Sequence, residues 1–245
     1  MNKKGRLYLI PAPLGDNDPR EVIPAPVFPL LRNLSTFVVE ETRTARRYLS
    51  AAGLKGSIGS LEFHELNEHT KPEEVDALLK LFEPRGAGEP GHDVGLITEA
   101  GLPAVADPGA QLVARCHAHG IEVVPLVGPS SLMLALMGSG LNGQRFTFCG
   151  YLPAKTEERR KAIREIEKRS AQLRQTQLFI ETPYRNDALL TDLVANLSPD
   201  TLLCCAADLT LPTQTIRTRT VRAWRSAPEP VGKRPCVFLL LASSN

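Results

Sequence analysis

The chain has 245 residues, of which 42% are hydrophobic and 23% are charged, and its formal net charge is +2. This composition excludes a disordered or fibrous protein, and the length suffices for one large α/β domain or two smaller ones. No apolar run approaches the ~18 residues of a membrane span, and no apolar segment follows the N-terminal lysines as it would in a signal peptide. We therefore expect a cytoplasmic protein that does not enter a membrane.

The five cysteines show no C-x-x-C spacing, and most of them lie within apolar runs. This usage is typical of buried free thiols in a reducing compartment rather than of a zinc site. His64 and His69 are five residues apart, which is too poorly phased on a helix or a strand for both to reach one ion. We expect no bound metal.

The charge is unevenly divided along the chain. Residues 1–143 contain 13 Lys and Arg against 17 Asp and Glu, a balance of −4, whereas residues 144–245 contain 16 against 10, a balance of +6. The glycine-rich segment 138–143 lies between the two halves and is a good candidate for an interdomain joint. The sequence predicts an N-terminal α/β domain at 1–143 and a basic C-terminal α/β domain at 144–245.

Strands and helices alternate in the first half of the chain. Strands are predicted at 6–11, 36–41 and 57–64, and strand–loop–helix units at 93–119 and 121–138. A helix is expected from about Arg43 to Ala52, where Gly53 would end it, and another from a Thr70 cap to about Phe82. Such alternation is typical of βαβ units and predicts a mainly parallel sheet.

The second half has more strands for its length. Strands are predicted at 146–150, 177–181, 202–208, 215–221 and 235–241, with helices at about 156–169 and 184–197. This pattern indicates a smaller α/β domain with a mixed sheet. The fold class is therefore α/β, with two α/β domains.

Two loops in the first half are rich in glycine and proline. One runs from Thr98 to Gly109 between a strand and a helix, and the other, Val127–Ser131, follows the next strand. Neither contains a P-loop or a G-x-G-x-x-G fingerprint, which disfavours ordinary phosphate or dinucleotide binding. Because ligands of open α/β sheets bind where strands end, the two loops predict a small-molecule cleft, in which Glu99 could face an ammonium group or ribose hydroxyls.

Polar side chains also follow other predicted strands. Glu40 and Glu41 are adjacent, so strand alternation sends them to opposite faces and at most one is expected to face the cleft. An alternative reading makes Thr42 the N-cap of the following helix. Asn67 is a candidate polar contact in the cleft.

Two zones of the second half are basic. Residues 155–174 hold eight basic and four acidic residues, and residues 217–234 hold six basic residues and one acid, Glu229. A charged helix is often only a solvated face, but the second zone has arginines around Trp224. Arginine with an aromatic side chain suits phosphates and stacked bases.

Seven segments together resemble the tetrapyrrole methylase superfamily of S-adenosylmethionine-dependent methyltransferases, and most closely its branch acting on small-subunit ribosomal RNA. The resemblance covers roughly residues 6–205. It rests on LYLIPAPLG at 7–15, EETR at 40–43, HELNE at 64–68, EAGLP at 99–103 with DPG at 107–109, GPS at 128–130, GYLPAK at 150–155 and ETPYR at 181–185. It implies two α/β domains, S-adenosylmethionine as cofactor, and a homodimer.

The resemblance also implies site residues. The cofactor contacts fall on Leu14, Thr98, Glu99, Ala100, Gly101, Val105, Ser130 and Ser131 in the first half, and on Glu181, Leu209, Pro235 and Cys236 in the second. The substrate side falls on Asn67, Tyr184 and Arg185, with Glu41 and Arg43 as catalytic candidates.

The chain departs from the family pattern at three places. Glu99 stands where Asp is usual, and Asp16 where Asn is commoner. The segment 208–214 reads DLTLPTQ, so that Leu211 replaces the lysine of a Glu-Leu-Thr-Lys motif on the substrate side.

The resemblance implies methyl transfer to a ribose 2′-hydroxyl of small-subunit ribosomal RNA. Two alternatives stay open: a methyltransferase acting on a tetrapyrrole or another small molecule, and a non-catalytic factor that binds S-adenosylmethionine or RNA.

Overall fold

The computed structural model describes residues 4–84, 86 and 88–243 and divides the chain into two compact units, Met1–Ser130 and Ser131–Asn245. The division lies before the segment 138–143 in which the sequence places the joint. The reason is α6 (Ser131–Ser139), which packs against strands of the second unit; an added Cβ at Gly138 would lie 2.4 Å from Ile216.

The first unit contains the parallel sheet that the sequence predicts. Its strands are β1 (Leu7–Ile10), β2 (Thr36–Val39), β3 (Glu62–Glu65), β4 (Val94–Ile97) and β5 (Val123–Pro125). They lie in the order β3-β2-β4-β1-β5, and every pair is parallel. All five strands therefore end at one edge of the sheet, where the loops that follow them meet.

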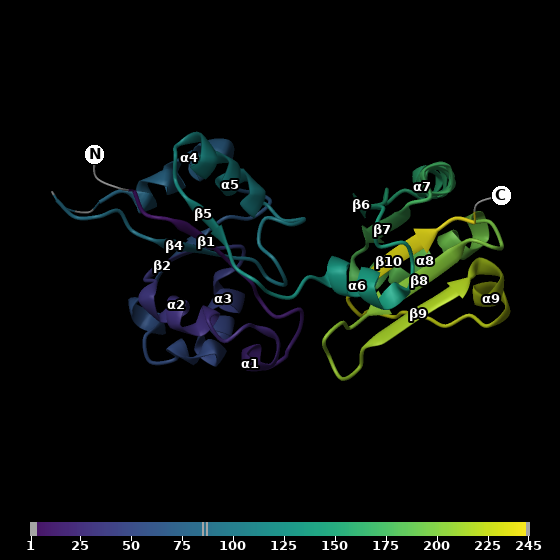
Figure 1. Cartoon of the computed structure of the whole chain (residues 1–245), viewed down its shortest axis with the longest axis horizontal. Coiled ribbons are helices and arrows are strands. Elements are labelled where there is room, and N and C mark those ends of the chain that lie inside the picture. Colours follow the sequence, from purple (N-terminus) through teal and green to yellow (C-terminus); the bar gives the residue numbers. More distant parts are fainter. Residues whose placement is uncertain (1–3, 85, 87, 244–245) are drawn as a thin grey trace. The chain divides into compact units, whose positions relative to one another are not determined.

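Helices cover both faces of this sheet (Figure 1). They are α1 (Pro19–Val22), α2 (Val27–Asn33) and α3 (Thr42–Leu49) on one side, and α4 (Pro72–Ala77) and α5 (Gly109–Ala118) on the other. Strand alternation sends Phe37 and Val39 into the core under α2 and α3, and sends Val38 into the core under α4 and α5. Burial on both faces explains why the inner strands β1, β2 and β4 are mainly apolar, whereas the edge strand β3 carries Glu62, His64 and Glu65.

The second unit contains a mixed sheet, also as predicted. Its strands are β6 (Phe146–Tyr151), β7 (Thr176–Ile180), β8 (Leu202–Ala207), β9 (Thr215–Thr220) and β10 (Cys236–Leu241), in the order β6-β7-β10-β8-β9. Only β6 and β7 pair in parallel. The remaining helices, α7 (Thr156–Leu173), α8 (Asn186–Asn196) and α9 (Val221–Ser226), enclose a core in which Phe179 stacks on Phe238 at 5.9 Å.

Several local expectations differ from the structure. The helices α1, α2 and α9 were not predicted, and residues 58–60 form a 3-10 turn, so that β3 begins only at Glu62. Lys71, not Thr70, occupies the N-cap position of α4, because the Glu74 carboxylate accepts the Lys71 N–H at 2.7 Å. No helix among the described residues has the length and apolarity of a membrane span.

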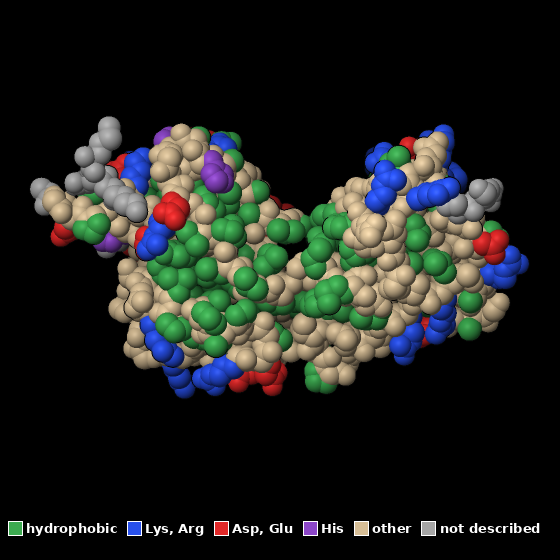
Figure 2. Space-filling model, in the orientation of Figure 1, with side chains coloured by type: hydrophobic (Ala, Val, Ile, Leu, Met, Phe, Trp, Pro, Cys, Tyr) green, Lys and Arg blue, Asp and Glu red, His purple; other side chains and the backbone are tan. Residues whose placement is uncertain are grey.

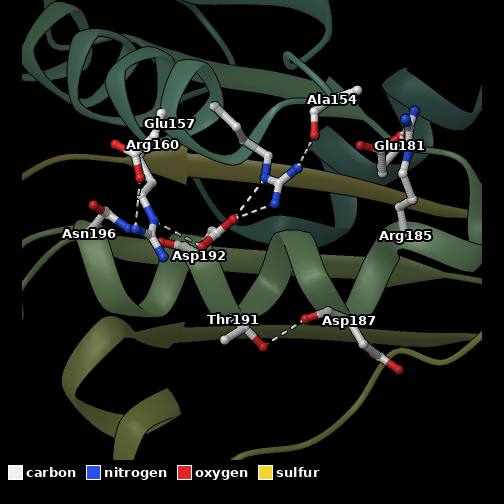
Figure 3. Close-up of polar contacts among 10 residues, drawn as sticks. Ala154, Glu157, Arg160, Glu181, Arg185, Asp187, Thr191, Asp192 and Asn196 are labelled. Atoms are coloured by element: carbon white, nitrogen blue, oxygen red, sulfur yellow. Dashed lines mark hydrogen bonds and ion pairs between the residues drawn. The ribbon is translucent and has the colours of Figure 1, made fainter.

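A buried ion pair joins α7 to α8 (Figure 3). The side chains of Arg159 and Asp192 are each only 9% exposed, and Arg159 Nε donates to Asp192 Oδ2 at 2.8 Å. Arg159 also donates to the Ala154 carbonyl at 2.7 Å, and Arg160 approaches the other Asp192 oxygen at 3.4 Å. One carboxylate thus contacts two guanidinium groups between two helices, and Arg160 also pairs with Glu157.

Removing this carboxylate is expected to leave a buried guanidinium without its counter-charge. Asp192→Ala should therefore lower the free energy of unfolding by about 3–5 kcal/mol, measured by denaturant titration. The control is Asp200→Ala, which breaks the exposed pair with Arg222 and should leave the free energy of unfolding nearly unchanged. Equal losses in the two variants would contradict this account of the second unit.

Candidate functional site

The loops after β1 and β4 are tied together at the carboxyl edge of the parallel sheet. Ala12 N donates to the Gly101 carbonyl at 2.9 Å, and Gly101 N donates to the Ala12 carbonyl at 3.1 Å. Gly101 has a φ of +76°, which favours glycine, and an added Cβ would lie 3.2 Å from Leu14 Cδ2. This two-bond bridge places Leu14 beside the segment that begins at Thr98.

The loop after β5 packs on the same place. A Cβ added to Gly128 would lie 2.1 Å from the Cβ of Pro11, so only glycine allows this approach. The two loops from which the sequence predicts a cleft therefore meet at one edge, and the loop after β1 joins them there. They carry the expected positions Leu14, Thr98, Glu99, Ala100, Gly101 and Ser130.

Glu40 is an additional residue of this edge, which the residue pattern alone does not single out. Its Oε2 accepts hydrogen bonds from Thr98 Oγ1 at 2.7 Å and from the Glu99 backbone N–H at 3.1 Å. The carboxylate thus connects the end of β2 to the end of β4. Strand alternation indicates that at most one of Glu40 and Glu41 faces the cleft, but it does not decide which one.

Glu99 is exposed at this edge, close to other carboxylates. Partial burial raises the pKa of Glu99, and repulsion by Glu40 and Glu41 raises it further. A carboxylate in such surroundings is stabilised by a nearby positive charge. The position suits a cationic ligand group.

The loop between Gly101 and Gly109 has a fixed, unusual backbone. Ala104 and Ala106 both have positive φ values, 65° and 63°. Asp107 Oδ1 accepts hydrogen bonds from Ala104 N at 3.0 Å and from Gly109 N at 2.7 Å, and burial raises the pKa of this carboxyl. Between the two strained alanines, Val105 is held outward with 47% of its surface exposed.

Glu41 and Arg43 lie at the start of α3. The Glu41 carboxylate accepts the backbone N–H groups of Arg43 at 2.9 Å and Thr44 at 2.6 Å, so Glu41 is the N-cap, and the alternative with Thr42 as the cap is wrong. These hydrogen bonds lower the pKa of Glu41, which makes it a weak base. The Arg43 side chain is exposed beside it.

Asn67 forms part of the turn after β3. Its side-chain oxygen accepts the His69 N–H at 3.0 Å, and its own N–H donates to Thr70 Oγ1 at 2.9 Å. The side-chain oxygen of Asn67 is therefore already hydrogen-bonded within the local turn.

The second unit gathers its expected cofactor positions at one sheet edge. Asp208 N donates to the Pro235 carbonyl at 3.0 Å, which holds Leu209 next to Pro235 and Cys236. Glu181 directly follows β7, which pairs with β10. Ser131, the remaining position, is the first residue of α6.

Glu181 is turned into the protein. Its side chain is fully buried, and Oε1 accepts from the Thr182 N–H at 2.7 Å and from Arg185 at 2.7 Å (Figure 3). Its Oε2 is buried and has no hydrogen-bond partner among the described residues. Arg185 also lies over the ring of Tyr184, which is 70% exposed.

Most arginines of the basic zone at 217–234 form ion pairs or hydrogen bonds within the second unit. Trp224 is only 2% exposed and donates to the Leu203 carbonyl at 2.9 Å, so the expectation that it could stack on a base is wrong. Arg219 pairs with Glu229 at 2.9 Å, and Arg225 donates to the carbonyls of residues 194 and 197 at the end of α8.

The basic zone on α7 is more accessible. Arg159 and Arg160 are turned toward Asp192, whereas the lysines and arginines on the other side of the helix are exposed. Figure 2 shows blue basic side chains gathered over α7. The exposed members on that side are Lys161, Lys168 and Arg169, whereas Arg164, although exposed, donates to Asn196 of α8 at 2.9 Å.

No cluster of three His, Cys, Asp or Glu side chains suitable for a metal ion occurs within residues 4–84, 86 and 88–243.

A family model of tetrapyrrole (corrin/porphyrin) methylases matches residues 6–223. The chain belongs to the tetrapyrrole methylase family. It is therefore a methyltransferase of the S-adenosylmethionine-dependent class, and the seven segments that carry the resemblance lie within the matched residues, most of them at the strand ends described above.

Two curated relatives are called ribosomal RNA small subunit methyltransferase I. The relative from Escherichia coli O157:H7 is 34% identical over 88% of this chain and 69% of its own length. The relative from Synechocystis is 32% identical over 84% of this chain and 67% of its own length. Among solved structures, the methyltransferase CobJ matches with a TM-score of 0.62 and 19% identity over 98% of this chain and 95% of its own, a likeness of fold.

The close approach at Gly128 yields a test of the site. Gly128→Ala should force its loop away from Pro11, because the proline ring cannot move aside. We expect a loss of about 1–3 kcal/mol in the free energy of unfolding, together with weaker binding of S-adenosylmethionine in calorimetry. Gly59→Ala, where nothing lies within 4 Å of the added Cβ, is the control. Unchanged binding in Gly128→Ala would show that this loop is not part of the cofactor site.

Proposed function

We propose that the protein transfers the methyl group of S-adenosylmethionine to a ribose 2′-hydroxyl of small-subunit ribosomal RNA. The observation that carries the proposal is the 34% identity, over 88% of the chain, to a ribosomal RNA small subunit methyltransferase I. We further propose a cytoplasmic homodimer, as the family resemblance implies.

The convergent loops of the first unit fit the cofactor. Glu99 supplies a carboxylate with a raised pKa for the cationic end of the donor, while Leu14 and Val105 offer apolar surface. The backbone of Ala100 and Gly101, together with the hydroxyl groups of Thr98, Ser130 and Ser131, offers hydrogen-bonding groups. In the second unit we assign Glu181, Leu209, Pro235 and Cys236 to the same cofactor. Because the Glu181 side chain is fully buried, position 181 would contact a ligand through its backbone.

S-adenosylmethionine, when bound, supplies an activated methyl group on a good leaving group. Alignment and exclusion of water are therefore the protein's main contributions. Arg43 is proposed to stabilise the charge that develops on the acceptor oxygen. Glu41, by capping α3, positions Arg43; its lowered pKa makes it a weak acceptor for the hydroxyl proton.

RNA is proposed to bind the exposed basic face of α7. Lys161 and Lys168 are seven residues apart, so they lie on the same side of the helix, two turns from each other. Basic side chains so arranged can follow a phosphate backbone. Asn67, Tyr184 and Arg185 are proposed to contact the substrate, and the exposed ring of Tyr184 could stack on a base.

Ionisation of Glu99 should govern the affinity for the donor. Its pKa is raised in the free protein, so protonation on acidification removes the negative charge at a higher pH than for an ordinary glutamate. Calorimetric affinity for S-adenosylmethionine should therefore decrease as the pH falls through this raised pKa. Glu99→Gln should weaken binding at neutral pH and flatten the pH dependence, whereas the exposed control Glu68→Gln should do neither. An unchanged pH profile in Glu99→Gln would exclude this role.

Methyl transfer itself is tested with labelled S-adenosylmethionine and small ribosomal subunits. We expect label in a 2′-O-methylated nucleoside, identified by mass spectrometry after digestion. Label transferred only to a tetrapyrrole or another small acceptor, or donor binding without transfer to any acceptor, would replace the proposal with one of the two alternatives.

Matched charge variants test the RNA face in the same assay. Lys161→Glu combined with Lys168→Glu should weaken RNA binding. The slope of the logarithm of the RNA binding constant against the logarithm of the salt concentration should become shallower by about one for each lost phosphate contact. Donor affinity should stay unchanged. The control combines Lys55→Glu with Lys80→Glu, two exposed lysines of the first unit. Equal RNA affinity in both double variants would contradict binding through α7.

A further inference from the structure

The first unit contains a hollow of about 170 Å³ directly beside the convergent loops. It lies between the segment after β1, one side of α3 and the end of β4. Thr98 and Glu99, which the proposed function assigns to the donor, also line this hollow. Its apolar lining includes Ala12, Pro13, Ala45, Tyr48, Ala51 and Ile97.

The volume decides which kind of group the hollow can hold. Pockets for whole cofactors or drug-sized ligands occupy about 300–1,000 Å³. A cavity of about 150 Å³ with apolar walls holds one benzene-sized ring. The hollow is therefore too small for the complete donor and matches a single planar ring.

Its lining also suits a planar ring. The Tyr48 hydroxyl donates to the Pro11 carbonyl at 2.9 Å, and this bond fixes the phenol against the loop after β1. Burial raises the pKa of Tyr48, so the ring stays neutral. A fixed aromatic group with alanine and proline around it provides apolar contact for a base without requiring a particular hydrogen-bond pattern.

The mouth of the hollow carries charge. Arg47 Nη2 lies 3.5 Å from Asp16 Oδ1, and the two side chains are 74% and 91% exposed. Such an exposed pair is worth little energetically, so Arg47 can leave Asp16 for a phosphate. A base inserted here would have its sugar at the mouth, beside Glu99 and near this arginine.

We propose that this hollow receives the base of the acceptor nucleotide, which leaves its stack and enters the first unit before methyl transfer. The inference rests on the proposed function and specifies how the RNA is held. Enzymes that act on a base extrude its nucleotide from the stack into such a pocket, and we extend this mode of binding to an enzyme that acts on the ribose. The base acts as an anchor, and its own ribose presents the hydroxyl at the donor.

The first test removes the base. An RNA acceptor that is abasic at the methylated position keeps its ribose hydroxyl but has nothing to fill the hollow. The wild-type protein should methylate it with a kcat/KM reduced about a hundredfold, because loss of correct positioning has effects of this size. Equal kcat/KM for the intact and abasic acceptors would overturn the inference.

The second test fills the hollow. Ala51 is exposed at the rim, so Ala51→Leu should fold normally and reduce kcat/KM for the intact RNA about a hundredfold, with unchanged calorimetric affinity for S-adenosylhomocysteine. On the abasic acceptor, Ala51→Leu should have the same kcat/KM as the wild type. Ala77→Leu, at an exposed alanine at the end of α4, is the control and should retain wild-type kcat/KM.

The outcomes separate the two proposals. If the wild type transfers methyl groups to intact RNA but Ala51→Leu is equally active, the base pocket is wrong and the proposed function stands. The base pocket is also wrong if Ala51→Leu lowers kcat/KM on the abasic acceptor by the same factor as on intact RNA. If the wild type methylates no RNA, the proposed function fails and the pocket inference fails with it.

Discussion

The pair of hydrogen bonds between Ala12 and Gly101 is the constraint on which the site of the first unit depends. It makes the loops after β1 and β4 a single structure, although almost ninety residues separate them along the chain. Parallel strands bring their carboxyl ends to one edge, but they do not by themselves fix the loops beyond it. The bridge does so, and the contact of Gly128 with Pro11 adds the third loop.

The carboxylates at this edge of the sheet favour a ligand with a positive charge. Glu40 spans the ends of β2 and β4 by accepting hydrogen bonds from Thr98 and from the backbone of Glu99. Partial burial raises the pKa of Glu99, and the charges of Glu40 and Glu41 raise it further. A negative first-unit edge suits a cationic methyl donor, while the exposed lysines of α7 in the second unit suit an anionic polymer. The opposite charge balances of the two halves fit the proposal that the donor's cationic group lies at the first-unit edge and that most of the RNA backbone lies on α7.

Much of this architecture could be predicted from residue patterns. Apolar runs predicted most of the parallel strands, and the glycine- and proline-rich loops do lie at the carboxyl edge of the parallel sheet, where we propose the site. Other features depend on tertiary contacts. The choice between Glu40 and Glu41 depends on which carboxylate reaches Thr98 and which one caps α3. Trp224 looked like a stacking platform among arginines, yet its core position follows from the packing of α9 on β8, which no local pattern reveals. The short helices α1 and α9 lack the length for a clear apolar period.

The central claim is that the converging loops of the first unit form the donor site, and amide hydrogen exchange tests it most directly. Exchange should be compared with and without saturating S-adenosylhomocysteine. The account predicts slower exchange in residues 12–17, 98–107 and 127–131, with the amides of Gly101 and Glu99 among those affected. Protection confined to other parts of the chain, such as α8 and α9, or no change at all, would contradict it.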